Sequence, residues 1–159
     1  MPTKYKSTER FLKPDPRFKN KVVSKFINCM MYGGKKSIAQ NILYDALDEV
    51  AKKITDKEPI DIFTTAINNV KPIVEVRSKR VGGATYQVPI EVIPKRQISL
   101  AFRWLLAATR KKKGRPMYLK LADELAAAYK GEGDAMQMRS NVHKMAEANK
   151  AFAHFAYYT

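Results

Sequence analysis

Residues 71–92, KPIVEVRSKRVGGATYQVPIEV, decide the fold, because the spacing of the apolar residues changes there from a helical period to a period of two. Apolar residues alternate with charged or polar ones on both sides of Gly82 and Gly83. A two-residue Gly-Gly loop favours the tight turns that join antiparallel strands, since glycine adopts positive φ at little cost. The stretch therefore predicts a β-hairpin over residues 73–93.

The apolar side chains of this hairpin are expected to lie towards its base. Val74 and Val76 of the first strand, with Val88 and Ile90 of the second, can pack there on neighbouring helices. An isolated two-stranded hairpin is marginally stable in water, so such support is required. The tip, at residues 80–85, is expected to project away from the rest of the molecule.

Helical periodicity flanks the hairpin on both sides. The predicted fold class is therefore mainly α, a six-helix bundle with one protruding β-hairpin inserted between helices three and four. We expect one domain over residues 1–159. It begins with a basic N-terminal arm at residues 1–21. The predicted helices cover residues 22–31, residues 38–54 after the Gly33-Gly34 turn, a segment from Pro59, a segment after Pro94, residues 117–128, and a last helix that follows Asp134 and includes Phe152.

Positive charge is concentrated in two blocks. Residues 1–36 contain 10 basic and 2 acidic residues, and residues 71–115 contain 12 basic and 2 acidic residues. Residues 37–70 have a net negative charge and residues 116–159 have none, so the two basic blocks account for the net charge of +15. Single-sign blocks produce an extended positive field that attracts a polyanion, which indicates nucleic-acid binding.

Composition excludes several other classes of protein. No apolar run approaches the ~20 residues of a membrane helix, and the first 20 residues lack the apolar core of a secretory signal. The basic character would also suit an anionic membrane surface. A single cysteine, Cys29, cannot form an internal disulfide, and a zinc site would lack sulfur ligands, so a reducing interior and no metal are expected.

Two local patterns have competing interpretations. The stretch GGKKS at residues 33–37 resembles a phosphate-binding loop, but Cys29 occupies the position of the first required glycine and Lys36 that of the required Ser or Thr. His143 and His154 could serve a nuclease. On one helix they would be separated by about 16 Å, too far to act on one substrate atom.

Three separated motifs resemble the family of protein seven of the small ribosomal subunit. They are VSKFINCMMYGGKKSIAQNILYDAL at residues 23–47, the hairpin stretch at residues 71–92, and HKMAEANKAFAHF at residues 143–155. The resemblance extends from about Pro14 through almost the whole chain and is to the bacterial or organellar type. It implies a helical protein with a β-arm, without enzymatic activity or a cofactor, on a bacterial cytoplasmic ribosome or in an organellar matrix.

The resemblance also implies partners. Proteins of this family bind the 3′ major domain of small-subunit rRNA, nucleate assembly of the subunit head, and lie near the exit-site tRNA, the mRNA exit path and small-subunit proteins nine and eleven. No membrane partner is expected. The residues expected to contact rRNA are Lys4, Lys6, Arg10, Lys25, Lys35, Lys36, Arg77, Lys79, Arg80, Lys95, Arg96, Arg103, Arg110, Lys111, Lys112, Lys113 and Arg115. Those expected near tRNA or mRNA are Arg80, Val81, Gly82, Gly83, Ala84, Tyr86 and His143.

Two other functions compete with this one. A free-standing nuclease would need a base, an acid and an oxyanion or metal partner together, and no segment supplies that set. An architectural DNA-binding protein would need a helix-turn-helix pattern with base-reading side chains, which is also missing. The sequence therefore favours a structural rRNA-binding protein.

Overall fold

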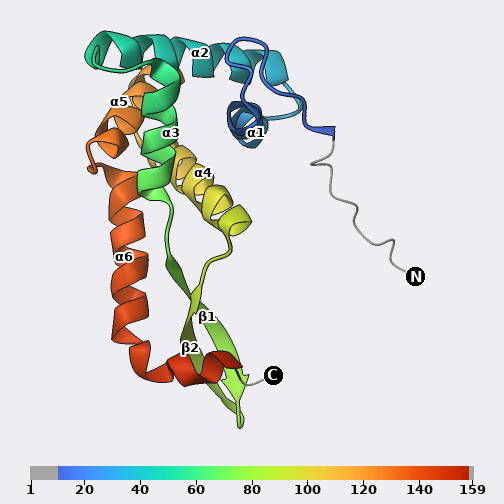
Figure 1. Ribbon diagram of the computed structural model, residues 1–159, viewed down its shortest axis with the longest axis vertical. Coiled ribbons are helices and arrows are strands. Elements are labelled where there is room, and N and C mark those ends of the chain that lie inside the picture. The colour runs from blue at the N-terminus through green and yellow to red at the C-terminus, as the bar shows by residue number, and fades with distance from the viewer. Residues whose placement is uncertain (1–10, 158–159) are drawn as a thin grey trace.

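The computed structural model describes residues 11–157 of the chain, which form six α-helices with the hairpin between the third and the fourth. Figure 1 shows their arrangement. This confirms the predicted fold class. The elements are α1 (Lys21–Met30), α2 (Lys36–Lys53), α3 (Pro59–Val70), β1 (Val74–Val81), β2 (Ala84–Glu91), α4 (Pro94–Lys111), α5 (Met117–Tyr129), α6 (Asp134–Ala148) and the 3₁₀ helix η2 (Lys150–Tyr157).

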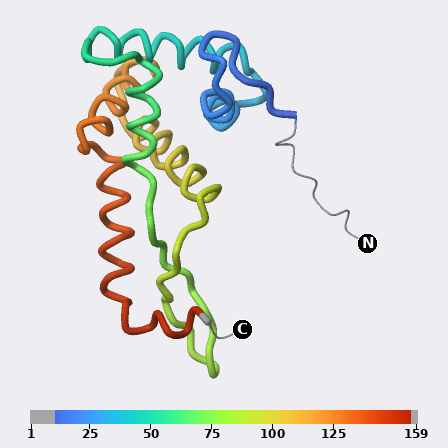
Figure 2. Tube along the Cα trace, viewed as in Figure 1, coloured from blue at the N-terminus to red at the C-terminus, as the bar shows by residue number. Residues whose placement is uncertain are grey.

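The helices pack around a core at one end of the molecule, and α6 and the hairpin extend away from it side by side (Figures 1 and 2). At the centre of the core the ring of Phe26 contacts the edges of two other buried rings. Its centroid lies 5.4 Å from that of Phe63 and 5.1 Å from that of Phe102, both in T-shaped geometry. These contacts join α1, α3 and α4, and such pairs add about 0.5–1.5 kcal/mol each beyond the burial of their area.

The turn of the hairpin forms as predicted. Gly82 and Gly83 have φ values of 58° and 89°, and Val81 pairs with Ala84 across them. Two consecutive positive φ values match the twist of the flanking strands, and they are costly for any residue with a Cβ. The two glycines therefore fix both the position of the turn and the register of the strands.

The apolar side chains of the hairpin lie towards its base as predicted, with Val88 buried and Val74, Val76 and Ile90 half-buried, but the two sets are not partners across the strands. Residues opposite each other in an antiparallel pair share a face. Val76 stands opposite Pro89, whereas Ile90 stands opposite Glu75, so the valines of β1 and the apolar pair of β2 lie on opposite faces. Both faces are partly covered, since Val76 and Pro89 on one face are half-buried and Val88 on the other is buried. The loop length alone already implies this register.

The last predicted helix is also partly wrong. α6 ends at Ala148, and the chain then turns into η2, which crosses beside the hairpin in Figure 1. Phe152 and His154 therefore lie in η2, and the two histidines do not share a helix. The change of direction turns the aromatic residues of the terminal segment towards β2.

The aromatic residues of η2 support the hairpin near its tip. The ring of Tyr86 packs against Phe155 and Phe152, with centroid distances of 4.9 Å and 5.3 Å. From the facing strand, Lys79 donates hydrogen bonds to the carbonyl oxygens of Phe155 and Ala156, at 3.0 Å and 3.3 Å. The hairpin is therefore held along its length and not only at its base.

Two helices begin at a proline, and α1 ends one residue before the predicted end at Met31. Pro59 and Pro94 each occupy the first turn of a helix, where the missing N–H would have no helical partner in any case. α1 ends at Met30, and an extended Met31 follows it. Gly33, with φ of 56°, belongs to the turn that leads to α2 and does not cap α1.

The described part of the N-terminal arm is docked on α2. Asp15 is almost completely buried, and its carboxylate accepts a hydrogen bond from the Tyr44 hydroxyl at 2.9 Å. It also accepts bonds from the backbone N–H groups of Arg17 and Phe18. Arg17 forms a two-point ion pair with Asp48 of α2. Residues 11–20 are thus irregular, as predicted, but fixed in place.

None of the helices within residues 11–157 combines the length and the apolar character needed to cross a membrane.

Candidate RNA-binding surface

Helix α4 carries many of the basic side chains of the candidate surface along its length. It begins and ends in basic residues, with Lys95 and Arg96 in its first turn and Arg110 and Lys111 in its last. A helix of this length spans about 27 Å. Arg103 is exposed between the two ends. The helix therefore spaces positive charge along one line, at distances comparable to several phosphate steps of an RNA strand.

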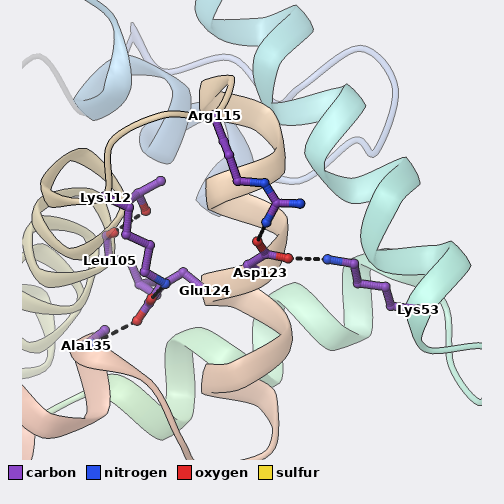
Figure 3. A network of polar contacts seen from close by, with 8 residues as sticks. Lys53, Leu105, Lys112, Arg115, Asp123, Glu124 and Ala135 are labelled. Atoms are coloured by element: carbon purple, nitrogen blue, oxygen red, sulfur yellow. Dashed lines mark hydrogen bonds and ion pairs between the residues drawn. The ribbon is translucent and has the colours of Figure 1, made fainter.

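The loop after α4 is held by two carboxylates of α5 (Figure 3). Glu124 is fully buried, and its carboxylate accepts hydrogen bonds from Lys112 Nζ at 2.6 Å and from the backbone N–H of Ala135 at 2.9 Å. Asp123 lies between Arg115, 2.9 Å away, and Lys53 of α2. These neighbouring carboxylates point to different partners, as expected for adjacent residues on a helix. Both act as structural anchors for the loop.

Arg110 joins the end of α4 to α1. Its Nη2 donates to the carbonyl oxygen of Met30 at 2.9 Å, which satisfies one of the terminal carbonyls of α1. Its guanidinium lies over the Tyr32 ring, 4.8 Å from the centroid. Tyr32 is 74% exposed and is a residue that the sequence analysis did not identify.

Tyr32 belongs to an apolar hollow of about 260 Å³ between α1, α2 and α4. Ile38, in the first turn of α2, borders the hollow and is 54% exposed. Lys35 and Arg110 stand at the rim. An aromatic ring beside cations can stack an unpaired base. In the sequence, the one feature that pointed to a stacking role for Tyr32 was its position directly before the Gly33-Gly34 turn.

The basic residues of this surface divide into two groups by their partners. Those that pair with carboxylates hold the structure together as well as contributing charge: Arg77, Arg96, Lys112 and Arg115. Within residues 11–157, the following make no ion pair with a carboxylate: Lys35, Lys36, Arg80, Arg103, Lys111 and Lys113. The second group can be altered without removing an ion pair among the described residues.

The structure does not bring all the expected contacts together. α1 and α2, which bear Lys25, Lys35 and Lys36, lie at the opposite end of the molecule from the hairpin tip (Figure 1). Lys25 is half-buried, and the expected contacts Lys4, Lys6 and Arg10 lie outside the described residues. The positive surface is therefore elongated, which suits a polymer better than a small anion.

Two residues expected near tRNA or mRNA are engaged within the protein. The Tyr86 ring is packed against η2, so its face is not free for a base. His143 accepts a hydrogen bond at Nε2 from the backbone N–H of Ile73, 3.1 Å away at the entry to the hairpin. The tip itself, Gly82 and Gly83 included, is exposed.

Neither histidine is placed for acid–base catalysis. His143 lies on α6, with its Nε2 bound to backbone, and His154 lies in η2 with Nδ1 2.9 Å from the carbonyl oxygen of Ala151. Within the part of the chain that the structure describes, no three His, Cys, Asp or Glu side chains gather as a metal site would require.

The hydrogen bond of His143 predicts a pH dependence of stability. Burial, together with the nearby positive charge of Arg139, lowers the pKa of His143 below its usual value. As pH falls, the unfolded chain therefore takes up this proton before the folded one, and stability decreases below a pH of about 6.5. Between pH about 7.5 and about 5.5, His143→Gln should lose less stability in urea denaturation than the wild type. Equal losses in both proteins would contradict this role.

Comparison with known proteins agrees with this geometry. A family model for ribosomal protein S7p/S5e matches residues 2–150. The small ribosomal subunit protein uS7 of Rhodopirellula baltica is 60% identical over 144 residues, which make up 90% of this chain and 92% of that protein. The uS7 proteins of Variovorax paradoxus and Paracidovorax citrulli are 52% and 53% identical over 157 residues, covering 99% of this chain and 100% of each relative. The chain belongs to the ribosomal protein S7p/S5e family.

Proposed function

We propose that the protein is a structural, rRNA-binding component of the small ribosomal subunit. Membership of the family supports this, and so does one structural observation: exposed cations that pair with no carboxylate of residues 11–157 follow α4 and the α1–α2 turn. Phosphate contacts dominate the affinity of such proteins for RNA, and they require charge that is not neutralised internally. The S7p/S5e family is structural and non-enzymatic, so the nuclease hypothesis is set aside.

The finer assignment follows from the resemblance and is likewise part of the proposal. The whole chain acts as one rRNA-binding domain on the 3′ major domain, where its binding nucleates assembly of the subunit head. The hairpin tip lies near the exit-site tRNA and the mRNA exit path, with small-subunit proteins nine and eleven as neighbours. The tip is exposed, whereas Tyr86 behind it packs against η2. This supports a contact between the tip and a partner.

Four lysines test the proposed RNA contact. Replacing Lys35, Lys36, Lys111 and Lys113 by Gln removes charge without removing any ion pair among the described residues. If each neutralises one phosphate, the log–log salt slope should become shallower by about 0.7–0.9 per residue, with a corresponding loss of affinity. The measurement is binding to a transcript of the 3′ major domain at several salt concentrations.

The control changes four exposed lysines outside the two basic blocks, Lys52, Lys57, Lys130 and Lys144, to Gln; of these, Lys52 also loses a solvent-exposed ion pair with Glu49, of a kind that contributes little to stability. It alters net charge equally and should retain most of the wild-type affinity and slope. Equal losses in both variants would show that net charge alone drives binding. Co-sedimentation of the tagged wild-type protein with small ribosomal subunits tests the proposed function itself, and its failure to sediment with them would refute that function.

A further inference from the structure

Glu75 is an acidic residue in the middle of the second basic block, and it is buried. Its side chain is 9% exposed, on the strand that also bears Arg77. The carboxylate accepts hydrogen bonds from Arg96 Nε at 2.6 Å and 2.8 Å, and from Arg77 Nε at 3.1 Å. One carboxylate thus joins the first strand of the hairpin to the first turn of α4.

Both arginines use only Nε in these bonds. Within residues 11–157, the Nη groups of Arg77 and Arg96 make no hydrogen bond, and their side chains are 55% and 41% exposed. Because both Nε atoms bond to the same oxygen, they lie within about 6 Å of each other. Two guanidinium groups are therefore fixed next to each other, and their Nη donors are not used by any hydrogen bond among the described residues.

This arrangement differs from a chance pair of exposed arginines in two ways. Like charges at this separation repel each other, and the buried carboxylate offsets that repulsion while it fixes both side chains. The three groups together still have a net charge of +1. A guanidinium held in advance also loses less side-chain entropy when it binds a phosphate, whose oxygens match its paired donors.

We infer that Glu75 makes Arg77 and Arg96 into a single binding site for one backbone phosphate of RNA, which rests on the proposed function of the protein. Glu75 acts as a positioning residue, because it contacts the arginines and not the phosphate. Removing this negative charge from a positive surface should weaken the binding of RNA, whereas attraction by net charge alone would strengthen it.

The test compares Glu75→Gln with Glu91→Gln in the full chain. Glu91 lies on the other strand, is exposed and has no ion-pair partner among the described residues, so the two variants change charge equally. With a transcript of the 3′ major domain as the probe, Glu75→Gln should bind roughly threefold to tenfold more weakly than the wild type. Glu91→Gln should bind as tightly as the wild type or slightly more tightly.

A double-mutant cycle separates positioning from a purely structural effect. Arg77→Gln should weaken binding in the wild-type background and have much less effect in the Glu75→Gln background, because the site is already lost there. Glu75→Asp supplies a second arm if Glu75→Gln folds poorly. It keeps the charge, but its shorter side chain cannot hold both arginines, so it should also weaken binding.

The outcomes distinguish this inference from the proposed function. Wild-type or tighter binding by both Glu75 variants, or an undiminished effect of Arg77→Gln in the Glu75→Gln background, would overturn the positioning role while leaving rRNA binding intact. A wild-type protein that fails to bind the transcript would instead refute the proposed function.

Discussion

Replacing Lys112 by Met is expected to reduce the free energy of unfolding by about 3 kcal/mol, because it leaves the buried carboxylate of Glu124 without its charged partner. Glu124 is fully buried, and Lys112 Nζ lies 2.6 Å from its Oε2. Its other oxygen is occupied by the backbone N–H of Ala135. The measurement is urea denaturation, in which the midpoint should fall with little change in the slope.

Lys113→Met is the matched control. Lys113 is the next residue, is exposed, and makes no ion pair with any described residue, so its replacement should cost less than about 0.5 kcal/mol. Adding Glu124→Gln to Lys112→Met should restore part of the lost stability, since the unpaired charge is then removed. Equal stability of the two single variants would show that water reaches Glu124 and that the ion pair contributes little.

This pair also shows where the sequence alone was insufficient. The basic residues at 110–115 were all expected to contact RNA, and Arg110, Lys111 and Lys113 are exposed. The sequence did not distinguish Lys112 from its neighbours, because its partner comes from a different helix and is buried only after α5 and α6 have packed. Charge blocks indicate the sign of a surface, but the side chains available to a ligand depend on tertiary contacts.

The hairpin turn and two helix starts could be predicted because short stretches of sequence determine them. The Gly82-Gly83 turn requires positive φ values, and Pro59 and Pro94 favour the first turn of a helix, so each signal acts within a few residues. The end of α6 has no comparable signal. Periodicity continued into residues 150–157, and only the contact with the hairpin shows why the chain turns there.

That contact leads to the second large expected effect. Replacing Tyr86 by Ala should increase hydrogen exchange of the hairpin amides by about 10- to 100-fold, because it removes two aromatic contacts of about 0.5–1.5 kcal/mol each. The lost contacts are those with Phe152 and Phe155 in η2. Exchange in the core helices should remain close to that of the wild type, since Tyr86 lies outside the core cluster. Hydrogen-exchange mass spectrometry resolves both regions in one experiment.

Tyr32→Ala supplies the control for this effect, since it removes a tyrosine that is 74% exposed and follows α1, the helix at the opposite end of the molecule from the hairpin tip (Figure 1). It should leave exchange in the hairpin unchanged. A chain shortened after Asn149 should reproduce the effect of Tyr86→Ala and exceed it, because the bonds from Lys79 to the carbonyl oxygens of η2 are lost as well. Without η2, the strands near the tip have only each other, and a hairpin alone is marginally stable. If the shortened chain kept wild-type protection in β1 and β2, the contacts with α6 would be sufficient to hold the hairpin, and η2 would have no part in presenting its tip to a partner.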